Sequence, residues 1–68
     1  MKLTAQMPNS HRSFVIERDE SVGYYLYVFE GDRCTHDYLQ DTLELAVEQA
    51  SQQFNVPKDA WKTVEVPD

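Results

Sequence analysis

DTLELAVEQASQQF, residues 41–54, is the segment that decides the fold, because it is the one stretch long and periodic enough to form an amphipathic helix. Its apolar residues recur at the i, i+3, i+4, i+7 spacing of a helix that lies on an apolar surface. The stripe consists of Leu43, Ala46, Val47, Ala50 and Phe54. The sequence therefore predicts one helix packed across a β-sheet.

Both ends of this helix carry sequence signals. Asp41, followed three residues later by Glu44, is typical of a capping box, so we expect Asp41 to cap the first turn. At the other end Asn55 can adopt the left-handed conformation that closes a helix, and Pro57 prevents its continuation. The helix is expected to end near Phe54.

Length, composition and charge limit the classes of protein to consider. The 68 residues are 41% hydrophobic with few glycines and prolines, which is typical of one small folded domain with a thin core. A formal net charge of −6 argues against nucleic acid and anionic membranes and favours a basic protein partner. A single cysteine excludes an intrachain disulfide, and without a leader or an apolar span the expected location is cytoplasmic.

Three strands are predicted before the helix. They are residues 13–18, 22–30 and 33–39. Gly31 and Asp32, between the second and third strands, indicate a two-residue hairpin loop of type II′. The predicted fold class is therefore α+β, with the order β-β-β-α(-β). A three-stranded antiparallel sheet carries one helix on one face, and a short fourth strand after the helix is possible.

The two ends of the chain carry weaker patterns. Residues 1–12 have no sustained period and are expected to form a flexible N-terminal arm, so that residues 13–68 make up the single domain. The arm can also include a short edge strand. Trp61 is expected to pack against the end of the core, and residues 62–66 can add an edge strand that ends at Pro67.

The second predicted strand has two chemically different faces. Leu26 and Val28 lie on one face, and we expect this face, together with Phe14 and Ile16, to pack beneath the helix. Aliphatic side chains interdigitate with a helix more readily than tyrosines, whose hydroxyl groups need water or a partner. The opposite face carries an aromatic row of Tyr25, Tyr27 and Phe29.

Cys34, His36 and Asp37 form the one cluster of residue types that commonly bind metals or act as nucleophiles. On a regular strand Cys34 and His36 share a face and supply two ligands at most, whereas zinc sites use three or four. A small sheet with one helix also offers little concavity for acyl transfer. We expect ordinary strand residues here, with no metal, no cofactor and no enzymatic activity.

Two surfaces are candidates for binding a partner. The first is a helix flank on which acidic residues surround an outward-facing leucine: Asp41, Glu44, Leu45 and Glu48. Such a flank is ordinarily a solvated face, but an acidic rim around an apolar anchor also suits a basic protein partner. The second surface is the aromatic row, which either binds a partner or is covered by the N-terminal arm, by the Trp61 segment or by a second copy of the chain. Nucleic acid is disfavoured because aromatic platforms that stack bases lie in cationic grooves.

Several motifs resemble a group of small uncharacterised bacterial proteins. They are the YLYV strand at residues 25–28, the LQDTLE helix start at residues 39–44 and the C-terminal Trp61. The resemblance covers most of residues 22–61 and implies the same fold, a domain of unknown function. Asn55 stands where this group is expected to have glycine, and it suits the same left-handed turn.

The sequence thus predicts an acidic, non-enzymatic protein-interaction module that neutralises or tethers a basic partner, as a monomer or a homodimer. One alternative is a structural homodimer through the aromatic face with no independent activity. A small enzyme or metal-binding protein is the alternative with the least support.

Overall fold

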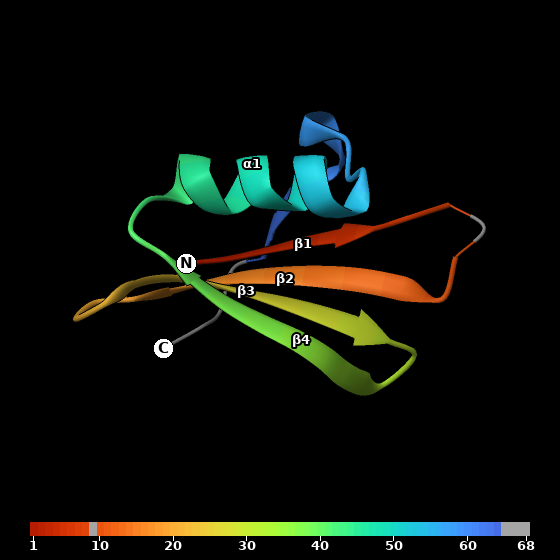
Figure 1. The fold of residues 1–68 in the computed structure, drawn as a ribbon, viewed down its shortest axis with the longest axis horizontal. Helices are drawn as coiled ribbons and strands as arrows, with labels where there is room; N and C mark the ends of the chain where they lie inside the picture. The colour runs from red at the N-terminus through yellow and green to blue at the C-terminus, as the bar shows by residue number, and fades with distance from the viewer. Residues whose placement is uncertain (9, 65–68) are drawn as a thin grey trace.

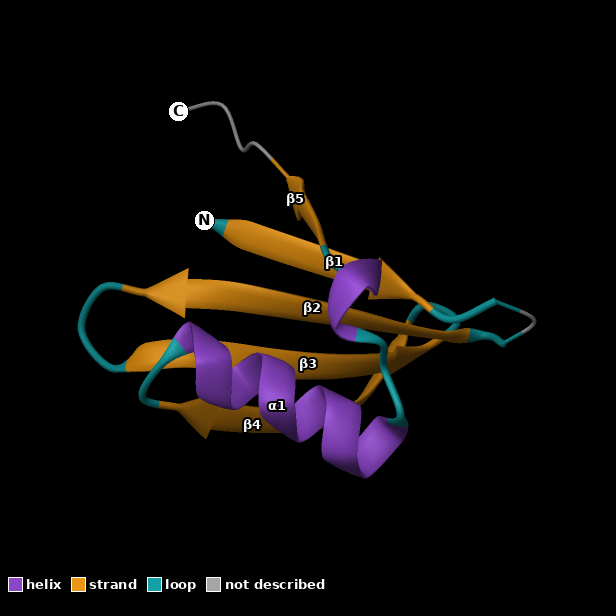
Figure 2. Ribbon diagram, turned by 90° about the horizontal axis from the view of Figure 1, so that it is seen from above, coloured by secondary structure: helices purple, strands orange, loops and turns teal. Residues whose placement is uncertain are grey.

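The computed structural model describes residues 1–8 and 10–64. Its core element is a five-stranded antiparallel sheet in the order β4-β3-β2-β1-β5, with one helix across one face (Figure 1). The elements are β1 (Lys2–Gln6), β2 (Arg12–Asp19), β3 (Gly23–Glu30), β4 (Arg33–Gln40), α1 (Leu43–Phe54), the short 3₁₀ helix η1 (Lys58–Ala60) and β5 (Lys62–Val64). Figure 2 shows α1 above the β3 and β4 side of the sheet.

The predicted three-stranded sheet is wrong, because both ends of the chain add a strand. Lys2–Gln6, expected in a flexible arm, forms β1 and pairs with β2 over its full length. The strand that follows the helix is present as β5, and it pairs with β1 at the far edge. The central strand is therefore β2, whereas the predicted three-stranded sheet would have β3 at its centre. The expected extension of β5 to residue 66 and its end at Pro67 lie outside the described residues.

The face of the sheet beneath α1 contains the core, as predicted. The most buried side chains are Phe14, Ile16, Leu26 and Val28 from the strands, Ala46 and Ala50 from the helix, and Ala5 and Val56. Leu43, Val47, Phe54 and Trp61 pack around them and are partly buried. Leu45 points away from this face and is 48% exposed. The predicted orientation of the helix, including the packing of Trp61 on the core, is confirmed.

The cap of α1 lies one residue later than predicted. The backbone N–H of Leu45 donates to Thr42 Oγ1 at 3.2 Å, so Thr42 and not Asp41 is the N-cap. The pairing of Gln40 with β3 keeps the chain extended up to that residue, so Asp41 belongs to the turn that leaves the strand. Glu44 then sits in the first turn, where the helix dipole favours a negative charge, but it is not placed to complete a capping box.

The end of α1 and the hairpin before β4 agree with prediction. Asn55 is left-handed, with φ 60° and ψ 31°, and the helix ends at Phe54. The N–H of Val56 donates to the Ala50 carbonyl at 3.2 Å. The pairing of β3 with β4 leaves Gly31 and one further residue in the loop, and Gly31 has φ 62°.

Within the described part of the chain, no helix has the length and apolarity that crossing a membrane requires.

Candidate functional site

One face of the sheet is covered and the other is not. In Figure 1, α1 and η1 lie on the same side of the sheet, and none of the other described elements lies over the opposite side. Residues directly opposite each other in antiparallel strands share a face, so the strand register shows which side chains lie on this open side. We call this surface the open sheet face.

The open sheet face consists of three rows that cross the strands. The first row is Leu39, Tyr25, Glu17, Lys2 and Val64; the second is Asp37, Tyr27, Val15, Thr4 and Lys62; the third is Cys34, Phe29, Ser13 and Gln6. Each row therefore contains one aromatic residue of β3. The predicted aromatic row runs along β3, next to the central strand β2.

The aromatic side chains of the open sheet face pack against one another. The rings of Tyr25 and Tyr27 stack at 5.8 Å with an interplanar angle of 18°, and Tyr27 and Phe29 are 6.5 Å apart in a tilted pair. All three are partly buried by such neighbours within the sheet. At the two edges Leu39 and Val64 are 47% and 38% exposed. The aromatic row is therefore a continuous strip along β3, and each edge of the face carries an exposed aliphatic residue.

The expectation that the N-terminal arm or the Trp61 segment covers this row is wrong. The first of these segments is strand β1, which extends the sheet sideways and does not fold over it. Trp61 packs on the core at the other face. The arm joins the sheet because its backbone pairs with β2, whose second edge would otherwise lack hydrogen-bond partners.

The charges on the open sheet face are mixed, although the chain as a whole is acidic. Glu17 and Asp37 flank Tyr27 on its two sides, while Lys2 and Lys62 lie on the strands beyond β2. Burial of the Tyr27 hydroxyl and the nearby carboxylate of Glu17, with a further contribution from Asp37, raise the pKa of Tyr27 above its ordinary value. The environment of Tyr27 therefore favours its neutral phenol over the phenolate.

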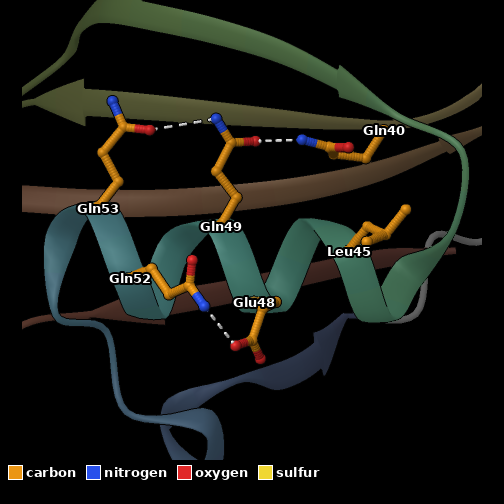
Figure 3. A pocket seen from close by; sticks show the side chains of 6 residues that line it. All are labelled: Gln40, Leu45, Glu48, Gln49, Gln52 and Gln53. Carbon is orange, nitrogen blue, oxygen red and sulfur yellow. Dashed lines mark hydrogen bonds between the residues drawn. The ribbon is translucent and has the colours of Figure 1, made fainter.

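The predicted acidic flank of α1 is divided between two grooves. Leu45 and Glu48 line one groove, together with the glutamines Gln40, Gln49, Gln52 and Gln53 (Figure 3). Glu44 lies instead at a second groove on the other side of Glu48, with Leu43, Val47 and Lys58. Asp41 is exposed ahead of the cap. Glu44 and Leu45 are therefore not gathered into one patch.

Glu48 already has partners within the chain. Its Oε2 lies 2.8 Å from Lys58 Nζ, and its Oε1 accepts a hydrogen bond from Gln52 at 2.8 Å. The hydrogen bond and positive charge of Lys58, with a smaller contribution from Gln52, lower the pKa of Glu48. Its carboxylate is thus partly neutralised before any basic partner arrives.

A chain of glutamine side chains, which the sequence interpretation missed, borders the first groove. Gln40 donates to Gln49 at 2.7 Å, Gln49 donates to Gln53 at 3.2 Å, and Gln53 donates to the Tyr38 hydroxyl at 3.0 Å. Figure 3 shows Gln49 between its two amide partners. The i, i+4 spacing of Gln49 and Gln53 is visible in the sequence, but their link to β4 depends on how the helix docks.

Cys34 and His36 lie on opposite faces of the sheet, so the prediction that they share a face is wrong. The β3 and β4 register shifts at a bulge, which places Cys34 opposite Phe29 and His36 opposite Val28. His36 consequently stacks on Tyr38 on the helix side, with ring centroids 6.1 Å apart. Across residues 1–8 and 10–64, no three His, Cys, Asp or Glu side chains gather as a possible metal site.

Comparison with protein-family models, curated proteins and solved structures finds no match to this chain. The resemblance to small bacterial proteins therefore stays a prediction, and the geometry of the two surfaces is what supports a function.

Proposed function

We propose that this chain is a non-enzymatic protein-interaction module that binds its partner through the open sheet face. The observation that carries the proposal is the position of Tyr25, Tyr27 and Phe29 on the side of the sheet that the other described elements leave uncovered. Aromatic residues are enriched in protein interfaces and dominate their binding energy. A partner that covers this row would remove a large apolar area from water.

The arrangement of residues around the row also suits an interface. Val15 adds an aliphatic centre beside Tyr27, and the charged groups Asp37 and Lys62 lie at the two ends of the same row. An apolar centre with a charged rim is the usual anatomy of a protein interface. Tyrosine is suited to such a site because its ring contributes contact area with few rotatable bonds, while its hydroxyl tolerates water before binding.

Photo-crosslinking tests this proposal directly. Benzoylphenylalanine replaces Tyr27 in the chain as it is made in its own cell, and a matched control replaces the exposed Gln52 on the outer side of α1. Because Gln52 lines the groove of the second candidate below, the exposed turn residue Glu20 is used as a further control position. We expect crosslinked products of defined mass from position 27 and none of the same mass from positions 20 and 52. A position 27 that yields no product, or the same products as position 20, would contradict the proposal.

The flank of α1 supports a second candidate, the binding of a basic protein. Leu45 is 48% exposed beside Glu48, and Glu44 borders a groove that Leu43 and Val47 make partly apolar. A basic helix or loop could place aliphatic groups against these residues and cations near the two glutamates.

A double substitution separates this candidate from the first. Leu45→Ala combined with Glu48→Lys should leave the fold intact, because both side chains are largely outside the core, and should abolish capture of a basic partner by the purified chain. Glu20→Lys, a charge change of the same size at an exposed turn position, is the control. Unchanged capture by the double variant would remove the flank as a binding site.

A further inference from the structure

We propose that the partner on the open sheet face is a second copy of this chain, packed face to face about a two-fold axis that runs parallel to the strands. This inference rests on the proposed function, because it names the partner of the same surface. It is argued from the distribution of charge across the strands and from the extent of the face.

The open sheet face is polarised across the strand order. Asp37 on edge strand β4 lies on one half, which β3 and its aromatic row also occupy, and Glu17 lies on the central strand β2. The lysines of this face, Lys2 on β1 and Lys62 on edge strand β5, lie on the other half. The charges at the two edges of the second row, Asp37 and Lys62, are therefore opposite in sign, although the chain carries a formal net charge of −6.

A two-fold axis parallel to the strands brings these opposite halves together. It reverses the strand order of the second copy and keeps each row in place, so that β4 lies over β5 of the second copy. Because Asp37 and Lys62 belong to the same row, each Asp37 then faces Lys62 of the second copy. In the same way Leu39 faces Val64 of the second copy.

The other in-plane two-fold axis, perpendicular to the strands, gives the opposite result. It places each strand over the same strand of the second copy, so that Asp37 faces Asp37 and Lys62 faces Lys62. Like charges brought together in this way disfavour an interface. The distribution of charge therefore selects one of the two ways in which the faces can stack.

The centre of the selected arrangement is compatible with close packing. Val15 of the central strand meets Val15 of the second copy near the axis, and Tyr25 comes to lie near Lys2 of the second copy, where a cation–π contact can form. Near the axis Glu17 faces Glu17 of the second copy, and Lys2, its cross-strand neighbour within each copy, lies beside it. Aligned stacking of sheets about 10 Å apart is the usual geometry of a β-sandwich.

The face is large enough for a weak to moderate dimer. Five strands about 4.8 Å apart and rows about 7 Å apart along the strands give a projected area of roughly 500 Å². Standard interfaces bury about 800 Å² on each partner. The aromatic side chains protrude from the sheet, so the area that they can bury is larger than the projected area. We therefore expect a reversible dimer with a dissociation constant in the micromolar range.

Sedimentation equilibrium of the purified full chain, with two charge-reversal variants, tests this arrangement. The wild-type mass should rise with concentration from 7.9 kDa towards twice that value. Asp37→Lys and Lys62→Asp should each weaken association at least about tenfold, because each makes both edge pairs like-charged. An equimolar mixture of the two variants should associate again, since each then presents the charge that the other lacks.

Glu20→Lys, an equal charge change at an exposed turn position outside both candidate surfaces, is the control and should leave the wild-type association unchanged. Circular dichroism of each variant checks that the fold is retained. A wild-type chain that stays monomeric, a dimer indifferent to both variants, or a mixture that fails to associate would each overturn the inference. A Lys62→Asp variant that associates like the wild type would instead identify a dimer formed through the β4 edge alone, because Lys62 lies on the other edge.

The crosslinking at position 27 distinguishes a failure of this inference from a failure of the proposed function. A monomeric wild type whose position 27 crosslinks to a different protein overturns the second copy as partner and leaves the interaction module standing. A monomeric wild type with no crosslinked product at all overturns both the second copy as partner and the proposed interaction module.

Discussion

The two sides of strand β3 carry the same backbone but have opposite environments. Leu26 and Val28 are 0% exposed beneath α1, whereas Tyr25 and Tyr27, one position away, lie on the side that the helix does not reach. A chain of this length buries a smaller share of its surface than a larger domain, and one helix can cover one face of the sheet. The difference shows that the covered side stabilises the fold, and the open side is the one that we propose binds a partner.

The chemistry of the side chains explains which side the helix covers. Ala46 and Ala50 are fully buried at the centre of α1, so the helix backbone can approach the aliphatic side chains of the strands closely. The tyrosine hydroxyl groups would lose water beneath such a helix without gaining hydrogen bonds. Covering the aliphatic side is therefore the lower free energy arrangement.

The largest predicted effect separates the two sides of β3 by their contribution to stability. Leu26→Ala should lower the free energy of unfolding by about 2–5 kcal/mol, because it leaves a cavity beneath the helix. Tyr27→Thr should cost less than Leu26→Ala, because Tyr27 is only partly buried and each of its two aromatic contacts is worth about 0.5–1.5 kcal/mol. Urea denaturation at low protein concentration measures both variants as monomers. Equal losses would show that the open sheet face belongs to the core.

The second prediction concerns the attachment of the helix to the covered side. Thr42→Ala should lower the free energy of unfolding by about 1 kcal/mol, because the N–H of Leu45 loses its acceptor. Asp41→Ala should change it much less, since Asp41 lies outside the cap. Thermal denaturation followed by circular dichroism compares the two variants. A larger loss for Asp41→Ala would show that Asp41, as predicted from the sequence, and not Thr42 caps the helix.

The third prediction uses the raised pKa of Tyr27 as a probe of the open side. Asp37→Asn should move the pKa of Tyr27 down towards its ordinary value, because one of the negative charges that raise it is removed. A raised pKa in the folded state adds stability below the pKa of the unfolded chain, and this contribution is lost as the pH rises through the folded pKa. Tyrosine ring resonances followed by NMR during an alkaline titration report the shift. No change in Asp37→Asn would show that Asp37 and Tyr27 do not interact.

The smallest effect is predicted at the solvent side of α1. Lys58→Met should move the pKa of Glu48 up towards its ordinary value, because Lys58 provides the main cause of its lowering. A lowered pKa in the folded state stabilises above the unfolded pKa, and this contribution is lost as the pH falls through the folded pKa. An NMR titration of the Glu48 carboxylate measures the shift, with Glu44 as the internal reference. An unchanged Glu48 titration would mean that the ion pair is not populated in solution.

The parts of the fold that were predictable depend on patterns within short segments. The stripe of α1, its end at Asn55 and the glycine of the β3–β4 loop each follow from a few neighbouring residues. The strand at residues 2–6 was not predicted, because Lys, Thr and Gln between Leu3 and Ala5 give little apolar alternation. The bulge that separates Cys34 from His36 left no local signal either, since it arises from the register between two strands.

The sequence by itself determined that this chain forms one helix, which residues of that helix face the core, and that Leu26 and Val28 lie beneath it. These features follow from spacing along one segment and from the difference between aliphatic and tyrosine side chains. Only the tertiary structure decided that the sheet has five strands, that Asp37 and Lys62 share a row across it, and that the other described elements leave the aromatic row uncovered. Strand pairing joins residues far apart in the chain through backbone hydrogen bonds, which every residue except proline can form, so the amino-acid pattern specifies it only weakly.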